Sequence, residues 1–106
     1  MLYFLEKKVI RELVLRLREI KAVEKIVLFG SVARREHKPD SDIDIAVYLQ
    51  NEVSHEVDKI AEEIYVKYYV PITIIKIVKG KIPIAMKPLL EKIEKEGVIL
   101  WEKKKE

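Results

Sequence analysis

The chain has 106 residues, 49% of them hydrophobic and spread along its length, which is the size and composition of one globular domain without room for a second. No apolar run approaches the roughly 20 residues of a membrane span, and the amino terminus lacks the long apolar core of a signal peptide, so we expect a cytoplasmic protein. A net charge of +3 falls short of the concentrated basic stripe of a duplex-binding protein, so nucleic acid is not the expected partner.

Residue usage narrows the possible chemistry further. Cysteine is absent, which excludes disulfides and thiolate metal sites. His37 and His55 stand in polar surroundings and are expected at the surface. Charged residues make up 37% of the chain, which has one Gln and one Asn, a bias typical of proteins from hyperthermophiles. We therefore expect a protein from a thermophilic prokaryote.

The amino-terminal region predicts an amphipathic helix. Its apolar side recurs at spacings of three and four residues, at Leu2, Leu5, Val9, Leu13, Leu17 and Ile20. This side should pack on a sheet. Phe4 and Leu15 lie on nearly the opposite side, where they are either ordinary surface residues or a contact for a partner or a second copy of the chain.

The remaining elements alternate between strands and helices. Strands are predicted at 25–29 and 42–49, and a turn is predicted at 38–41, directly before the second strand. Ser54 is expected to cap a helix that Pro71 ends, and the apolar run at 71–78 predicts a strand buried on both faces. Pro88 should begin a short helix closed by Gly97, before a last strand at 98–101. The expected fold is a small mixed sheet of about four strands flanked by helices, α+β or α/β by the definition used.

The segment IVLFGSVARREHKPDSDIDIAV carries the candidate chemistry. Gly30-Ser31 follows the first strand, and Asp42-Ile43-Asp44 comes ten residues later at the start of the second. Side chains two apart on a strand share a face, so both carboxylates can converge on one magnesium ion. Gly30 would let backbone approach a ligand closely, and Ser31 would open a helix whose free N–H groups favour phosphate.

Each half of this motif also has an ordinary structural explanation. Gly30-Ser31 alone is typical of a strand end followed by a helix cap, and the two aspartates alone are typical of the solvated face of an edge strand. Ile43, Ile45 and the residues that follow them instead indicate a buried strand, where two adjacent like charges are costly without a counterion. The two halves together favour a site for phosphate and metal.

This pattern resembles the minimal nucleotidyltransferases (MNT proteins) of the DNA polymerase β-like superfamily, and the layout of helices and strands agrees over most of the chain. The resemblance implies one minimal nucleotidyltransferase domain over residues 1–106, with a polymerase β palm-like fold. It also implies that Gly30 and Ser31 contact the nucleotide triphosphate and that Asp42 and Asp44 hold magnesium and support catalysis. Arg34 stands where the family often has a basic residue in A-R-G, and we expect it to bind the nucleotide and offset charge on its phosphates, while Arg35 replaces the glycine that follows.

One departure from the family pattern concerns catalysis. Members that transfer nucleotides commonly bear a third carboxylate on a later strand, in a stretch like P-V-D-V-V, whereas this chain reads P-I-T-I-I from Pro71. Thr73 then occupies the position of the acid. A neutral hydroxyl binds magnesium weakly and cannot accept a proton at neutral pH. Asp58 and Glu62 are candidate substitutes for this acid, but they fall on the predicted helix between Ser54 and Pro71, with no spacing that directs them to the site.

The resemblance further implies a function. MNT proteins are often paired with HEPN ribonuclease toxins and act as antitoxins, some by transferring AMP from ATP to the toxin. We expect such an antitoxin, with ATP as substrate, magnesium as cofactor and a HEPN protein as partner. Two alternatives stay open: an inactive module of the same fold that neutralises its partner by occlusion, and a protein that binds or modifies nucleic acid, for which salt-sensitive binding would be evidence. Homo-oligomer formation is also left open.

Overall fold

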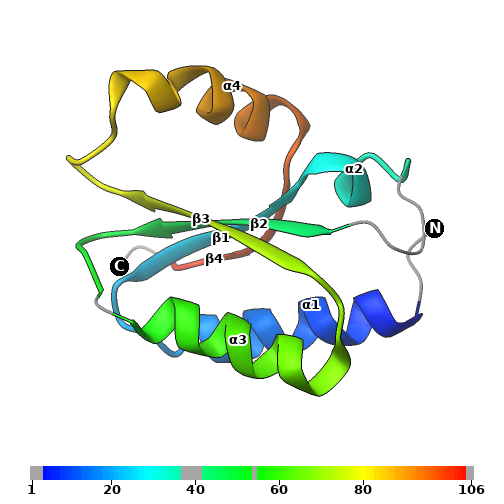
Figure 1. Ribbon diagram of the computed structural model, residues 1–106. Helices are drawn as coiled ribbons and strands as arrows, with labels where there is room; N and C mark the ends of the chain where they lie inside the picture. Colours follow the sequence, from blue (N-terminus) through cyan, green and yellow to red (C-terminus); the bar gives the residue numbers. More distant parts are fainter. Residues whose placement is uncertain (1–3, 37–41, 54, 105–106) are drawn as a thin grey trace.

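The computed structural model describes residues 4–36, 42–53 and 55–104, and it confirms the expected α+β class with a four-stranded mixed sheet (Figure 1). In chain order the elements are α1 (Phe4–Leu17), β1 (Val23–Phe29), α2 (Gly30–Ala33), β2 (Ile43–Leu49), α3 (Glu56–Tyr68), β3 (Ile72–Val78), the 3-10 turn η1 (Ile84–Met86), α4 (Lys87–Glu96) and β4 (Val98–Glu102). No helix in the described ranges is long and apolar enough to cross a membrane.

The sheet has the order β3-β2-β1-β4. β1 is antiparallel to β2 and to β4, whereas β2 is parallel to β3 and is connected to it through α3. Phe29, the last residue of β1, pairs with Asp44 near the start of β2. The antiparallel arrangement therefore brings the end of β1 beside the first residues of β2, which are the two halves of the sequence motif.

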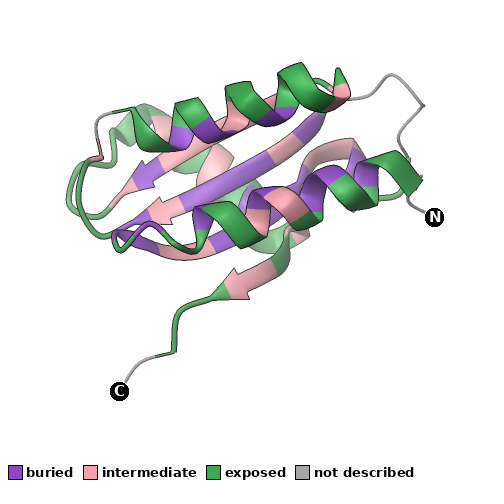
Figure 2. Ribbon diagram, turned by 90° about the horizontal axis from the view of Figure 1, so that it is seen from below, coloured by how far each residue is buried: buried purple, intermediate pink, exposed green. Residues whose placement is uncertain are grey.

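Helices cover both faces of the sheet. α1 and α3 lie on one face, while α2 and α4 lie on the other (Figure 1). Figure 2 shows buried positions along the central strands and on the sides of α1 and α3 that face them. This larger core includes Leu13, Ile45 and Ile64, and a smaller one beneath α4 consists of Val27, Phe29, Ala46, Ile77 and Ile93. Alternation along β2 places Ile43 and Ile45 in the larger core and leaves Asp44 and Ala46 facing α2 and α4.

α1 forms as predicted, with most of the expected apolar side buried. Val9, Leu13 and Leu17 are buried, but Leu5 is exposed, because it lies near the start of the helix at the margin of the core, and that prediction is wrong. Leu2 lies outside the described residues. Phe4 and Leu15 are exposed, so their role as a contact stays a prediction.

The expectation that β3 is buried on both faces is wrong. β3 is an edge strand, and apart from Ile77 its residues are only partly buried, because no further strand covers its outer side. The predicted cap Ser54 lies outside the described residues, and exposed His55 occupies the position before α3. Gly97 ends α4, but with an extended backbone (φ −71°) instead of a left-handed turn. A Cβ there would lie 2.5 Å from Val27 Cγ1, so glycine is required by close packing.

Candidate nucleotide-phosphate and metal site

Gly30 and Asp44 are in direct contact. Gly30 has φ +77°, a left-handed conformation that side chains rarely adopt, and a Cβ built on it would lie 2.1 Å from Asp44 Oδ2. Only glycine therefore allows the chain to turn from β1 into α2 while Asp44 keeps its position. The Gly-Ser and Asp-x-Asp halves of the motif border one surface, as the sequence predicts.

Asp42, Asp44 and Thr73 form the acidic corner of this surface. Asp44 is opposite Thr73 in the parallel β2–β3 pair, and Thr73 Oγ1 donates a hydrogen bond of 3.2 Å to Asp42 Oδ2. Asp42 is exposed and Asp44 is half-buried. Thr73 thus lies beside the carboxylates, at the place expected for a third acid. Within the described part of the chain, no cluster of three or more His, Cys, Asp or Glu residues suited to a metal occurs.

The electrostatic environment raises the pKa of Asp44. Burial is the main cause and repulsion from Asp42 adds to it, while Arg34 and Lys92 act in the opposite direction. Lys92 comes from α4 and was missed in the sequence, because nothing in the motif indicates that this helix packs above the strands. The corner therefore holds two carboxylates in mutual repulsion, with basic side chains close enough to moderate it.

This raised pKa predicts how Asp44→Asn changes stability with pH. A raised folded-state pKa means that the ionised carboxylate destabilises the fold above that pKa and has no such effect below its ordinary value of 3.8. At about pH 7 the variant should gain about 0.5–1 kcal/mol in free energy of unfolding, a modest gain because solvent screens the half-buried group. Urea unfolding should show the gain vanishing toward about pH 3. If the gain in free energy of unfolding stayed the same in acid, the raised pKa of Asp44 would not be its cause.

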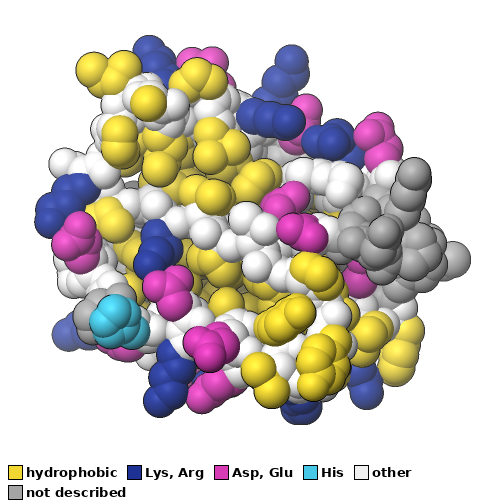
Figure 3. All heavy atoms as spheres, in the orientation of Figure 1, with side chains coloured by type: hydrophobic (Ala, Val, Ile, Leu, Met, Phe, Trp, Pro, Cys, Tyr) yellow, Lys and Arg dark blue, Asp and Glu magenta, His cyan; other side chains and the backbone are white. Residues whose placement is uncertain are grey.

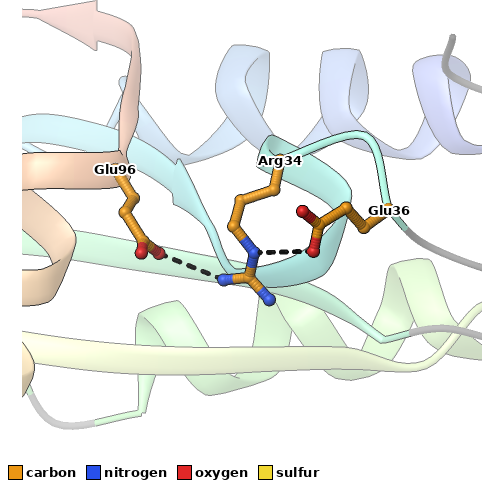
Figure 4. Close-up of polar contacts among 3 residues, drawn as sticks. All are labelled: Arg34, Glu36 and Glu96. Atoms are coloured by element: carbon orange, nitrogen blue, oxygen red, sulfur yellow. Dashed lines mark hydrogen bonds and ion pairs between the residues drawn. The ribbon is translucent and has the colours of Figure 1, made fainter.

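Arg34 connects α2 to α4. Its Nε donates to Glu36 at 3.3 Å and its NH1 donates to Glu96 at 3.1 Å (Figure 4). These two hydrogen bonds raise the pKa of the guanidinium group. The sequence predicted Arg34 as a phosphate contact, but its partner Glu96 could not be foreseen, since it is 62 residues away in the chain.

The turn around α2 differs from the sequence prediction in two respects. α2 is a four-residue helix that begins at Gly30, with Phe29 in the cap position, so Ser31 lies within the first turn and is not the cap. Arg35 has φ +60°, at the position where the family pattern has glycine. The left-handed conformation explains the glycine of that pattern, and Arg35 adopts the same conformation with a side chain.

At the acidic corner the side chain of Asp42 is exposed and that of Asp44 is half-buried. A hollow of about 520 Å³ exists elsewhere, but its lining includes Lys25 and Tyr48, at the opposite end of β1 and β2, and none of the candidate residues. Asp58, considered as a substitute acid, instead pairs with Lys76 at 2.8 Å. Lys76 alternates to the α3 side of the sheet, so Asp58 lies on the other face from Asp44.

Comparison with known proteins identifies the family. The family described as "Polymerase beta, Nucleotidyltransferase" matches residues 11–106. The chain belongs to the polymerase β nucleotidyltransferase family. This confirms the resemblance inferred from the Gly30-Ser31 and Asp42–Asp44 pattern, and the nucleotidyltransferase fold that it implied. Among curated proteins no match was found.

Several solved structures share this nucleotidyltransferase fold. A structure described as a toxin-antitoxin with AMP-PNP has a TM-score of 0.70 at 21% identity, over 89% of this chain and 73% of its own. A tri-AMPylated HEPN toxin in complex with MNT antitoxin, from Shewanella oneidensis, gives 0.62 at 18% identity, over 94% and 74%. A putative nucleotidyltransferase from Sulfolobus solfataricus gives 0.50 at 20%, over 93% and 78%. At these identities the likeness establishes the fold.

Proposed function

We propose that this chain is a nucleotidyltransferase-type antitoxin that binds ATP with magnesium and transfers AMP to a HEPN ribonuclease toxin. The observation that carries the proposal is the contact between Gly30 and Asp44, which joins a glycine turn to an acidic pair on one surface. Membership of the nucleotidyltransferase family supports it. So do two similar structures, one described with AMP-PNP and the other with an AMPylated HEPN toxin.

Asp42 and Asp44 fit the requirements of magnesium. The ion is usually held by one or two carboxylates, with phosphate and water oxygens completing its octahedral shell. The raised pKa of Asp44 reflects burial and the repulsion from Asp42, and a divalent cation would relieve that repulsion. Thr73, already bonded to Asp42, would orient that carboxylate. Magnesium held there would neutralise phosphate charge during transfer.

The glycine turn provides the place for the triphosphate. Gly30 has no side chain, so a phosphate can approach its backbone and Ser31 beside the two carboxylates. Arg34 adds positive charge at the same end of the sheet, and it would exchange Glu36 or Glu96 for a phosphate oxygen to make direct contact. These residues bind and align the nucleotide.

Transfer is chemically feasible with Thr73 in the place of a third carboxylate. The attacking hydroxyl oxygen forms a bond to the α-phosphorus, pyrophosphate leaves, and the hydroxyl proton passes to solvent. The transition state of phosphoryl transfer is loose, so alignment and charge stabilisation dominate over removal of that proton. Because Asp42 is exposed at the acidic corner, a hydroxyl on another protein can approach it.

A second candidate is a module of the same fold that neutralises its partner by occlusion, without transfer. The observation that favours it is Thr73, which offers Asp42 a hydrogen bond where a third carboxylate would contribute charge. This candidate predicts binding of the partner with no covalent change.

Labelled ATP separates the two candidates. The chain is incubated with a HEPN partner, magnesium and ATP carrying the label at the α-phosphate; the proposal predicts a labelled partner and loss of its ribonuclease activity. ATP labelled at the γ-phosphate is the matched control and must leave the partner unlabelled, because pyrophosphate departs. Inhibition without α-label would establish occlusion. A partner that is neither labelled nor inhibited would refute the antitoxin function.

A further inference from the structure

The segment between β3 and α4 exposes apolar side chains. Residues 82–86, Ile-Pro-Ile-Ala-Met, connect the end of β3 to α4 through η1. Ile84 is 91% exposed and Ile82 is 45% exposed. Figure 3 shows hydrophobic side chains gathered over this part of the molecule, around α4 and the segment leading into it. An isoleucine so fully exposed within an apolar segment indicates a contact surface.

This segment lies on the same face of the sheet as the acidic corner. Along β3, Thr73, Ile75 and Ile77 alternate toward α4, and Thr73 is opposite Asp44. Ile77 belongs to the smaller core beneath α4, and the partly buried Ile75 packs against that core. Thr73 lies near the start of β3, whereas residues 82–86 follow its end, about 17 Å farther along the strand, and α4 runs back from them toward the acidic corner, where Lys92 and Glu96 lie close to Asp44 and Arg34.

Two of the other exposed apolar residues lie on the opposite face of the sheet. Val66, which is 60% exposed, lies on α3, and Phe4, which is 74% exposed, lies on α1. Both helices cover the opposite face of the sheet (Figure 1). A partner bound on those helices would be separated from Asp44 by the sheet itself, whereas a partner bound at residues 82–86 would lie on the same side of the sheet as Asp44 and would reach it by extending along α4.

Lysines surround the apolar segment. Lys79 and Lys81 precede it and Lys87 follows it, and all three are exposed. Lys81 forms an ion pair with Glu52 at 3.3 Å. Both side chains are exposed, so this pair is weak, and the positive charge of Lys81 can still attract a partner. An apolar centre with a basic rim is complementary to an apolar patch bordered by acidic side chains.

We propose that residues 82–86 dock the protein acceptor, whose contacting surface is an apolar patch with an acidic rim, and so present its hydroxyl to the acidic corner. This inference rests on the proposed function and identifies where the partner binds. A second copy of the chain fits less well, because a symmetric contact through this segment would bring the same lysines against each other.

The test compares two substitutions that place a charge on an exposed apolar position. Ile84→Glu alters the segment, and Val66→Glu is the matched control on the opposite face. Both side chains are mainly exposed, so neither change removes core contacts. Binding of the HEPN partner, measured by calorimetry, should weaken at least about tenfold with Ile84→Glu and stay unchanged with Val66→Glu. Magnesium-dependent ATP binding should be unchanged in both variants.

The outcomes separate this inference from the proposed function. If the unaltered chain labels its partner and Ile84→Glu binds that partner equally well, the docking proposal is overturned and the function stands. Failure of the unaltered chain to bind a HEPN protein overturns both. If light scattering shows that the chain alone is a dimer, which Ile84→Glu dissociates, the occupant is a second copy.

A separate experiment tests the acidic rim of the partner. The charge reversals Lys79→Glu and Lys87→Glu together should slow association of the chain with the HEPN partner at low salt, and an unchanged association rate would refute the acidic rim.

Discussion

A chain carrying both Asp42→Asn and Asp44→Asn is expected to lose the magnesium-dependent part of its ATP binding and to transfer AMP at least about a thousandfold more slowly. Amides keep the shape of the side chains but remove both negative charges from the corner. A neutral pair has little affinity for a hard cation, so the phosphates would lose the group that offsets their charge during transfer.

Calorimetry with and without magnesium measures the binding, and α-labelled ATP measures the transfer. Asp58→Asn is the matched control, because this aspartate is exposed and paired with Lys76 on the other face of the sheet. The double variant should remain folded, since it removes the repulsion that raises the pKa of Asp44. Retention of full magnesium-dependent ATP binding would show that the two aspartates are not the metal ligands.

The sequence predicts the centre of this site because the chain connection leaves little freedom there. A strand ending at Phe29 and a second beginning beside Asp44 are antiparallel neighbours, so the residue after the first must lie against the start of the second. The periodicity of two then directs Asp42 and Asp44 to one side. The position of Thr73 beside Asp44 follows from the parallel register of β2 and β3. The family pattern had already suggested that Thr73 takes the place of the third carboxylate.

The surroundings of the site depend on tertiary packing that local patterns do not encode. Lys92 and Glu96 reach the site because α4 packs over β1 through Ile93 and because Gly97 allows a close approach to Val27. The helical spacing of α4 predicts which side is buried but not which strand end it covers. The apolar run of β3 likewise suggested a central strand, whereas strand order, which places it at the edge, is a property of the whole sheet.

Gly30→Ala is expected to destabilise the fold by about 2–5 kcal/mol. A left-handed backbone costs an alanine about 1–2 kcal/mol, and the new Cβ would lie 2.1 Å from Asp44 Oδ2, so Asp44 must move, at a further cost of about 1–3 kcal/mol. Urea unfolding at about pH 7 measures the total. The displaced carboxylate should also weaken magnesium-dependent ATP binding.

Gly80→Ala separates the two contributions. Gly80 has nearly the same φ, +78°, but a Cβ there would meet nothing within 4 Å, so this variant reports backbone strain alone. Asp44→Ala removes the carboxylate but keeps a Cβ that would lie 3.3 Å from the new one, so in this background Gly30→Ala should cost only slightly more than Gly80→Ala. The difference from its cost beside Asp44 is the coupling energy of the pair. A coupling near zero would mean that Gly30 and Asp44 are not in contact in solution. The proposed function places the triphosphate at Gly30 and the metal at Asp44. The coupling energy between these two residues therefore tests the geometry of the proposed nucleotide site without any ligand.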